Sequence, residues 1–265
     1  MSRDVSDKIV IVTGATAGIG KATAELFKKK GAKVVCLARR RTEEFDCIPT
    51  DVTNKEAVLA AIAAVKEKYG RIDILVNNAG MGISGAAEST SEEAVRKIFE
   101  LNFFGSLNVT KAVIPVMREQ GGGCIVNLSS VAAELAIPFQ SFYSATKAAV
   151  SSLSAALRNE LRPFGIRVTA VLPGDVKTDF TSSREKNASD DPAYGDRVAR
   201  SVAVMERDER NGMSPDVIAR LVLRVATAKH PPVSRVGGGK YVLLCALAKV
   251  LPERLVSYIL YKMYA

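Results

Sequence analysis

The stretch that decides the fold is Ile9-Val10-Ile11-Val12-Thr13-Gly14-Ala15-Thr16-Ala17-Gly18-Ile19-Gly20. The β-branched run 9–12 predicts a strand buried on both faces, and the pattern from about Gly18 to Lys30, closed by Gly31, predicts a helix. Glycines at such a turn let a diphosphate approach the amides of the helix N-terminus, where the helix dipole favours negative charge. The spacing is G-x-x-x-G-x-G and not the commoner G-x-G-x-x-G, so a purely structural strand-to-helix connection stays as the alternative.

The alternation of short apolar runs and longer helical patterns continues along the chain. Further strands are expected at 33–38, 72–76, 124–128 and 166–172, and helices near 54–68, 91–119 and 142–162. Pro115 is expected to kink the second of these helices. This pattern predicts an α/β fold in one domain over residues 1–265, a Rossmann-type doubly wound parallel sheet with helices on both faces.

Two later segments differ from this pattern. Residues 178–212 are polar and lack a long apolar stripe, which is typical of an irregular substrate lid. A helix is expected to follow with Ser214 as its N-cap and Pro215 at its first position. Residues 240–264 predict two short amphipathic helices divided by Pro252.

The composition is that of a soluble globular protein, with 48% hydrophobic and 25% charged residues in 265. The chain has one histidine and four cysteines without a C-x-x-C pair, so we expect no metal site, and buried reduced thiols. The first apolar run is too short for a signal peptide and no run approaches the roughly 20 residues of a membrane span. These observations favour a cytoplasmic location.

The net charge of +9 is concentrated in two segments. Residues 28–41 carry +7 and residues 229–265 carry +5, which leaves a net −3 on the remainder. No nucleic-acid-binding motif accompanies the positive charge, so we expect no nucleic-acid partner.

The first basic segment ends in Leu37-Ala38-Arg39-Arg40-Arg41, directly after the second expected strand. An acid at this place in a dinucleotide-binding fold accepts from a ribose 2′-hydroxyl, whereas arginine pairs with a 2′-phosphate. No acid occurs before Glu43, so NADP(H) is favoured, with Arg39 as the first candidate and Arg40 as the second; a solvated basic cluster is the alternative. Asp51-Val52 fits a contact with the adenine edge, or a helix cap near Thr53.

Tyr143 and Lys147 are spaced i, i+4 and share one helix face. The pKa of a free tyrosine is about 10. A lysine ammonium about 4 Å away would lower that pKa by at most about 3 units, which would suit proton exchange with a carbonyl or an alcohol. The pair alone is common by chance.

Six segments together resemble the short-chain dehydrogenase/reductase family, in order and in spacing, over roughly residues 8 to 180. They are Thr13 to Gly20, Asn77-Asn78-Ala79-Gly80, Leu101-Asn102, Asn127-Leu128-Ser129-Ser130, Tyr143-x-x-x-Lys147 and Pro173-Gly174-x-Val176-x-Thr178. The resemblance implies a catalytic tetrad of Asn102, Ser130, Tyr143 and Lys147. With the arginines and Asp51-Val52, the expected cofactor contacts are Gly14, Thr16, Ala17, Gly18, Ile19, Gly20, Arg39, Arg40, Asp51, Val52, Asn78, Ala79, Gly80, Tyr143, Lys147, Pro173, Gly174, Val176 and Thr178.

The resemblance also implies the role of each member of the tetrad. Ser130 and Tyr143 would hydrogen-bond the substrate oxygen, and Lys147 would lower the pKa of Tyr143 and bind the nicotinamide ribose. Asn102 would hold a water that links Lys147 to solvent. The choice of Ser130 over its neighbour Ser129 rests on family spacing, because the residues alone do not separate them.

Two departures from the family pattern concern the adenosine end. Ala17 stands where many NADP-dependent members have a basic residue, so the 2′-phosphate would depend mainly on Arg39 and Arg40. Only eleven residues separate Arg39 from Asp51, so the crossover helix that the family commonly has there is expected to shrink to a turn.

Apolar residues in the loops around the expected site predict a hydrophobic carbonyl or alcohol substrate. They lie in 81–86 and 134–141, and the expected lid 178–212 would add further contacts; these loops are similar to those of hydroxysteroid and retinol dehydrogenases. The predicted function is NADP(H)-dependent hydride transfer to or from a steroid-, retinoid- or acyl-like substrate. An oxoacyl thioester reductase, a sugar or polyol reductase, and a catalytically silent dinucleotide sensor are the alternatives.

The resemblance implies a homodimer or homotetramer, with helices 91–119 and 142–162 pairing with their symmetry mates. The tail 240–264 has two interpretations. It covers the substrate cleft or a dimer contact, or it attaches to a membrane surface, with Lys240, Lys249, Arg254 and Lys262 interspersed among apolar residues.

Overall fold

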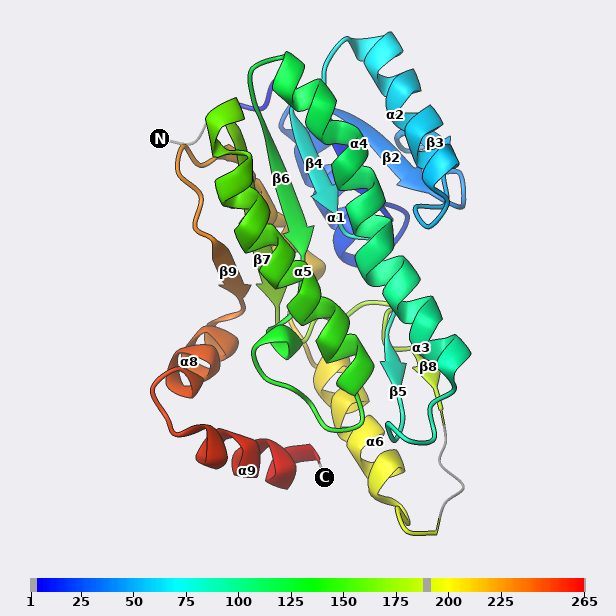
Figure 1. The fold of residues 1–265 in the computed structure, drawn as a ribbon, viewed down its shortest axis with the longest axis vertical. Helices are drawn as coiled ribbons and strands as arrows, with labels where there is room; N and C mark the ends of the chain where they lie inside the picture. Colours follow the sequence, from blue (N-terminus) through cyan, green and yellow to red (C-terminus); the bar gives the residue numbers. More distant parts are fainter. Residues whose placement is uncertain (1–3, 188–191, 265) are drawn as a thin grey trace.

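The computed structural model describes residues 4–187 and 192–264, and its centre is a seven-stranded parallel sheet (Figure 1). The order β3-β2-β1-β4-β6-β7-β9 reverses its direction of growth between β1 and β4, which is where open α/β sheets bind ligands. The strands are β1 (Ile9–Thr13), β2 (Lys33–Ala38), β3 (Asp46–Pro49), β4 (Ile74–Asn77), β6 (Gly123–Leu128), β7 (Ile166–Pro173) and β9 (Ser234–Gly237). The doubly wound fold predicted from the sequence is confirmed.

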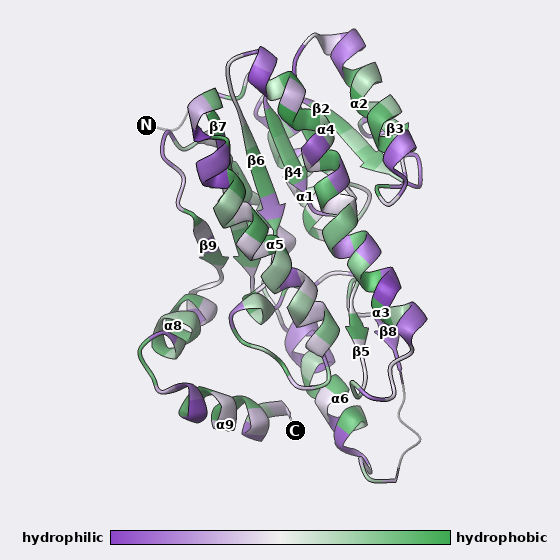
Figure 2. Cartoon of the chain, in the orientation of Figure 1, coloured by the Kyte–Doolittle hydropathy of each residue, from purple (hydrophilic) through white to green (hydrophobic). Residues whose placement is uncertain are grey.

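Helices cover both faces of this sheet. On one face, α1 (Gly18–Lys29) and α7 (Pro215–Thr227) pack over a buried cluster; on the other, α2 (Lys55–Tyr69), α4 (Ser106–Glu119) and α5 (Ser141–Glu160) pack over a second cluster. Successive strand residues point to opposite faces, so Val10 and Val12 join the first cluster, and Ile9 and Ile11 the second. This explains the continuous apolar runs of the strands, which Figure 2 shows as hydrophobic.

The expected helix 91–119 is divided into three parts. α3 (Glu92–Phe99) leads into a π-helical turn, Glu100–Gly105, which is followed by α4. Pro115 lies inside α4, so the interruption falls at the π-turn and not at the proline. Gly105 allows the close approach of this turn to the core, because a Cβ there would lie 2.8 Å from Cγ2 of Val52.

The expected irregular lid contains regular structure. β8 (Glu185–Lys186) pairs with β5 (Ile83–Ser84). The helix α6 (Arg197–Arg210) buries Val198 and Met205 on one side, and the charged residues between them hide this apolar stripe in the sequence. Residues 188–191 of the lid lie outside the described residues. The predicted cap after it is confirmed, because the Ser214 hydroxyl accepts from the Asp216 N–H and Pro215 opens α7.

Two further predictions about elements are confirmed. No helix separates β2 from β3, so the crossover is reduced to a turn, and the tail forms α8 (Gly239–Ala248) and α9 (Glu253–Tyr264) on either side of Pro252. All four cysteines are free; Cys47 is half-buried and the other three are buried. Within the described ranges, no helix has the length and apolar character needed to cross a bilayer.

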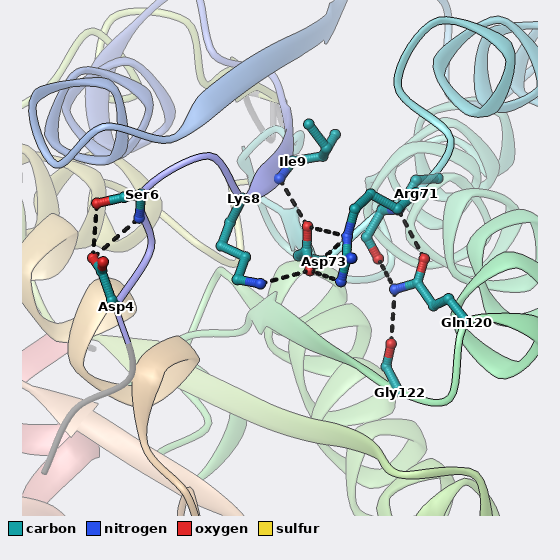
Figure 3. A network of polar contacts seen from close by, with 9 residues as sticks. Asp4, Ser6, Lys8, Ile9, Arg71, Asp73, Gln120 and Gly122 are labelled. Atoms are coloured by element: carbon teal, nitrogen blue, oxygen red, sulfur yellow. Dashed lines mark hydrogen bonds and ion pairs between the residues drawn. The ribbon is translucent and has the colours of Figure 1, made fainter.

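A polar network ties the amino ends of the central strands together (Figure 3). Asp73 accepts from the Ile9 N–H at 3.0 Å and forms an ion pair with Arg71, so the start of β1 is tied to the segment before β4. Gln120 donates to the carbonyl of Ile72 and accepts from its N–H. These contacts hold the amino ends of the strands together, at the end of the sheet opposite to the carboxyl ends.

Candidate active site

The glycine turn after β1 leaves the N-terminus of α1 open. Gly14 and Gly18 have φ of +65° and +53°, and a Cβ at Gly20 would lie 2.3 Å from the carbonyl oxygen of Gly14. Ala17 is the N-cap residue and provides no side-chain hydrogen bond, and the first turn has no acidic residue. The free N–H groups and the helix dipole therefore suit an anionic group such as a diphosphate.

The turn is tied to the segment that follows β4. The Thr13 hydroxyl accepts from the N–H groups of Asn78 and Ala79, at 2.9 and 3.0 Å. The Asn78 amide donates to the carbonyls of Thr13 and Gly14. These bonds hold the two segments side by side at the reversal of the strand order.

A cavity of about 340 Å³ opens at these carboxyl ends. It brings together most of the residues that the sequence singled out: Gly14, Ala17, Gly18, Ile19, Arg40, Asn78, Ala79, Gly80, Ser130, Tyr143, Lys147, Pro173, Gly174, Val176 and Thr178. The described residues include no group of three histidine, cysteine or acidic side chains arranged to hold a metal ion. The glycine-lined end of this cavity, with its open helix terminus, fits a nicotinamide dinucleotide.

The structure places the other predicted contacts outside the lining of the cavity. Arg39 and Arg40 are both exposed; Arg40, the second candidate, lines the cavity, and Arg39, the first candidate, does not. Asp51 accepts from the N–H and the hydroxyl of Thr53, which is a local turn, and Val52 is buried in the core. Thr16, Gly20 and Asn102 also lie outside the lining.

The structure distinguishes the two adjacent serines. The Ser129 hydroxyl is buried and hydrogen-bonds the carbonyl of Lys147 and the hydroxyl of Ser151, both at 2.8 Å. Ser130 is half-buried and hydrogen-bonds Tyr143. Both serines line the cavity; the Ser129 hydroxyl anchors α5, whereas the Ser130 hydroxyl lies beside Tyr143.

Burial dominates the protonation of Tyr143 and Lys147. It raises the pKa of Tyr143 to about 12, opposed by the hydrogen bond with Ser130, and it lowers the pKa of Lys147 to about 8. The Lys147 ammonium donates to the carbonyl of Leu128 at 2.9 Å and lies 5.6 Å from the centre of the Tyr143 ring. The expected lowering of the Tyr143 pKa by Lys147 is absent from this geometry, because desolvation outweighs attraction at that distance.

Asn102 lies in the π-turn, directly behind the cavity. Its amide donates to the Met81 carbonyl and the Thr146 hydroxyl, and its Oδ1 accepts from the Met81 N–H at 2.8 Å. A Cβ at Gly80 would lie 3.1 Å from that Oδ1 and 3.6 Å from the Lys147 Nζ. Asn102 therefore clamps the 80–81 backbone against the tyrosine helix, and one lone pair of Oδ1 remains for a water.

The other half of the cavity contains residues of segments 134–141 and 178–212, where the sequence predicted substrate contacts, together with residues from elsewhere in the chain. Val131, Ala132, Gln140, Asp175, Asp179, Phe180, Ser183, Met205, Glu209 and Tyr264 line it with Ile137. The expected apolar contacts at 81–86 do not line the cavity, since Ile83 lies in β5 and in a separate buried cluster. The expected lid 178–212 included Glu209, and the interpretation of the tail 240–264 as a cover for the substrate cleft agrees with Tyr264, which α9 brings to the cavity from the far end of the chain.

Carboxylates are prominent in this half. Glu209 forms an ion pair with buried Arg184, and its Oε2 has no hydrogen-bond partner in the described part of the chain. Asp175 accepts from the Tyr241 hydroxyl of α8. Burial raises the pKa of both carboxyls, with Arg184 opposing the shift at Glu209 and Tyr241 opposing it at Asp175.

Comparison with known proteins identifies the class that this fold and site define. The family model for short chain dehydrogenases matches residues 8–189, and the chain belongs to that family. The 3-ketodihydrosphingosine reductase of Bacteroides thetaiotaomicron is 38% identical, over 97% of this chain and 98% of the relative.

Two solved structures support the same assignment. A short-chain dehydrogenase from Streptomyces avermitilis superposes with a TM-score of 0.83 at 35% identity, covering 92% of this chain and 94% of that one. The 3-ketoacyl-(acyl-carrier-protein) reductase of Brucella melitensis, complexed with NADH, has a TM-score of 0.76 at 28% identity, covering 89% of this chain and 99% of that one. The chain is therefore an oxidoreductase of the short-chain type, with the fold that binds a nicotinamide dinucleotide.

Proposed function

We propose that this protein is an NADP(H)-dependent reductase of long-chain ketones that carry an amino alcohol head, the chemistry of 3-ketodihydrosphingosine. The observation that carries the reaction type is the convergence of Ser130, Tyr143 and Lys147 on the cavity at the open N-terminus of α1. The catalytic tetrad expected from the sequence is completed by Asn102. This complete set counts against the alternative of a silent dinucleotide sensor.

The protein groups are arranged for the protonation of a carbonyl oxygen, while the nicotinamide supplies the hydride when it is bound. Ser130 and Tyr143 donate to the substrate oxygen and stabilise its developing charge. The Tyr143 pKa of about 12 keeps its hydroxyl protonated at neutral pH, which favours its role as general acid in the reductive direction. Lys147, with a pKa of about 8, is mainly cationic there; it would bind the ribose hydroxyls, give up a proton to restore the Tyr143 hydroxyl after turnover and regain that proton from solvent through a water on Asn102.

The preference for NADP(H) rests on Arg40. Its side chain lines the adenosine end of the cavity, where a 2′-phosphate would take a charge-assisted hydrogen bond. One of the acids that follow β2 is Glu44, whose carboxylate forms an ion pair with Lys21 at 2.7 Å. Glu44 therefore does not offer a free acceptor to a ribose 2′-hydroxyl. The Brucella complex holds NADH, so the choice of cofactor depends on residues of this chain.

The substrate class is supported by the mixed lining of the other half of the cavity. Ile137, Phe180 and Met205 suit an alkyl chain, whereas Asp179 and the Oε2 of Glu209, which the ion pair with Arg184 leaves without a partner, suit an ammonium group. Among the described residues that line this half, Lys147 is the cationic one, and we assign it to the catalytic group. A cation in the substrate is therefore matched better than the neutral steroid or retinoid also expected from the sequence.

Gln140 supplies a further polar contact for the head of the substrate. It is 5% exposed and lines the cavity three residues before Tyr143. A side-chain amide in the wall of the cavity can hydrogen-bond a hydroxyl or amino group of the substrate.

NADPH consumption with matched ketones tests this proposal. The panel contains 3-ketodihydrosphingosine, the same chain without its amino group, a steroid ketone and retinal. We expect kcat/KM to be highest for the amino ketone, and Glu209→Gln to reduce its advantage over the deaminated ketone by at least about tenfold, the cost of one lost charged contact. Equal rates on all four ketones would refute the substrate class, and no oxidation of NADPH with any of them would refute the reaction.

The same proposal includes a homodimer or homotetramer formed through α4 and α5, as the sequence predicts. Phe104, which opens toward solvent beside α4 at 42% exposure, is the large apolar side chain that such a contact would cover. Light scattering at micromolar concentration tests it, and a wild-type protein that is only monomeric would contradict it.

A further inference from the structure

The two C-terminal helices bury very little of themselves against the rest of the protein. Within the described part of the chain, α9 has no buried residue, and α8 buries only Tyr241 and Cys245. In Figure 1 both helices lie apart from the helices that cover the sheet. An isolated helix of this length is marginal in water, so these helices require a further surface to cover them.

Their exposed side is apolar. Of the fourteen large hydrophobic side chains that are exposed among the described residues, ten lie here and form what we term the tail face. They are Val242, Leu243, Leu244, Leu247, Val250, Leu255, Tyr258, Ile259, Tyr261 and Met263. Monomeric soluble proteins rarely gather so many exposed apolar side chains in one segment unless that segment contacts a partner or a membrane.

The charges interspersed with the tail face identify the partner. Lys240, Lys249, Arg254 and Lys262 accompany one acid, Glu253. Cations beside apolar residues and exposed tyrosines are the pattern of helices that lie in the plane of an anionic bilayer, where the tyrosines sit at the level of the headgroups. A second copy of this chain would bring the same positive charges against one another, so self-association is disfavoured.

The tail face is connected to the catalytic cavity. Half-buried Val256, Leu260 and Tyr264 follow one another at i, i+4 and i+8, and α9 lies against α6. Tyr264 lines the cavity that contains Tyr143. The rest of the surface of α9 carries the exposed apolar residues, so the same helix contacts the cavity and contributes to the tail face.

Two contacts hold this arrangement to the body of the protein. The Tyr241 hydroxyl donates to Asp175, and a Cβ at Gly174 would lie 1.9 Å from the Tyr241 ring, so α8 packs directly on the Pro173-Gly174 turn. Lys249 forms an ion pair with Glu134 at 3.3 Å, beside the loop that leads to α5. The tail face therefore has a defined position relative to the cavity.

We propose that the tail face docks on the surface of an anionic phospholipid bilayer and that the cavity takes its long-chain ketone from that bilayer past Tyr264. The proposed docking on the bilayer is based on the tail face alone, whereas the proposed uptake of the ketone also rests on the proposed function. The apolar side chains would lie among the acyl chains near the headgroups, with Arg254 and Lys262 at the level of the phosphates.

Sedimentation with vesicles tests the docking without any substrate. The full chain is mixed with vesicles of phosphatidylcholine containing phosphatidylserine, or of phosphatidylcholine alone. We expect binding to the anionic vesicles, a loss of about 25-fold for the double variant Arg254→Gln and Lys262→Gln, at about fivefold per charge, and no detectable binding for Leu243→Ser combined with Val250→Ser.

Matched control variants remove the same kinds of side chain, two cations or one exposed leucine, at positions outside the tail face. Lys29→Gln with Lys30→Gln removes two charges from the other basic segment, and Leu59→Ser removes an exposed leucine from α2. Both controls should bind like the wild type. Equal binding of all variants, or no binding of the wild type to either vesicle, would overturn the proposal. So would an oligomer in light scattering that Leu243→Ser dissociates, since the tail face would then be a contact between copies.

The uptake is tested by comparing ketones in vesicles and in solution. For Leu243→Ser with Val250→Ser we expect wild-type kcat/KM on a short water-soluble ketone and a loss of at least about tenfold on a long-chain ketone embedded in anionic vesicles, because the enzyme no longer concentrates at the bilayer. An equal loss on both ketones would contradict the uptake. A wild-type protein that binds vesicles and reduces neither ketone would contradict the proposed function and leave the docking intact.

Discussion

Replacing Lys147 with methionine should stabilise the protein while it abolishes turnover. Lys147 is buried among the described residues at 6% exposure, and burial lowers the pKa of its ammonium from 10.5 to about 8. Methionine has a flexible apolar side chain that can fill the same space without a charge. The proposed reaction requires the lysine, so this substitution distinguishes the proposed catalytic role of Lys147 from its effect on folding stability.

The magnitude follows from the shift in pKa. The difference between the folded and unfolded values corresponds to about 3 kcal/mol of unfavourable charge burial at neutral pH. Loss of the hydrogen bond from Nζ to the Leu128 carbonyl costs about 1 kcal/mol. We therefore expect Lys147→Met to raise the free energy of unfolding of the nucleotide-free protein by about 2 kcal/mol, or its Tm by about 5 °C.

The difference in the free energy of unfolding between Lys147→Met and the wild type should depend on pH. Because the folded pKa lies below the unfolded one, the unfolded wild type binds more protons between pH 8 and 10.5 and the wild type gains stability with rising pH in that window. The advantage of the variant should therefore be complete below pH 8 and disappear toward pH 10.5. The Tyr143 hydroxyl, whose pKa is raised, is present in both proteins and so largely cancels from the comparison.

Urea denaturation followed by far-UV circular dichroism measures the effect, since the chain has no tryptophan for fluorescence. The transitions of the wild type and Lys147→Met are compared at neutral pH and at a pH of about 10. Lys111→Met, at an exposed position of α4, serves as the control and should change little. A variant less stable than the wild type at neutral pH, or a gap independent of pH, would refute the reasoning.

Three further predictions concern the site. Tyr143→Phe should bind NADPH with nearly wild-type affinity by nucleotide fluorescence and lose at least about 100-fold in kcat, because the proton donor is removed; retained turnover would reassign the acid. Arg40→Asp should shift the NADPH/NADH ratio of kcat/KM toward NADH by about tenfold or more, and Arg39→Asp by much less; the reverse order would return the phosphate contact to Arg39. Gly174→Ala should lower the stability to urea by about 1–3 kcal/mol, because its Cβ would lie 1.9 Å from the Tyr241 ring; an unchanged transition midpoint would show that α8 shifts at little cost.

The residue order alone was enough to predict the reaction centre, because its parts are short and local. The glycine turn and the Tyr143–Lys147 pair each lie within one turn or one helix, so spacing along the chain determines their geometry. The continuous apolar strands likewise indicated a sheet covered on both faces. A break in helix 91–119 was predicted, but at Pro115; the π-turn depends on how Gly105 and Asn102 pack against segments far along the chain, which no local pattern encodes.

The tertiary structure made the distinctions between neighbours that the sequence left open. Ser129 and Ser130 have the same side chain and both line the cavity, and only the packing of α5 shows that the Ser129 hydroxyl is bonded to that helix. Arg39 and Arg40 have the same charge, and only the path of the chain after β2 turns the second toward the cofactor end.

The substrate half depended most on the fold. Glu209 and Tyr264 come from α6 and α9, far from Tyr143 along the chain, and reach the cavity because these helices pack together over it. By itself the sequence determined the family and the glycine turn, since local spacing specifies their motifs, and it indicated the proposed tetrad through the family resemblance. Only the tertiary structure decided which side chains line the substrate half and which apolar residues of the tail stay uncovered, because both depend on contacts between segments that the chain order keeps apart.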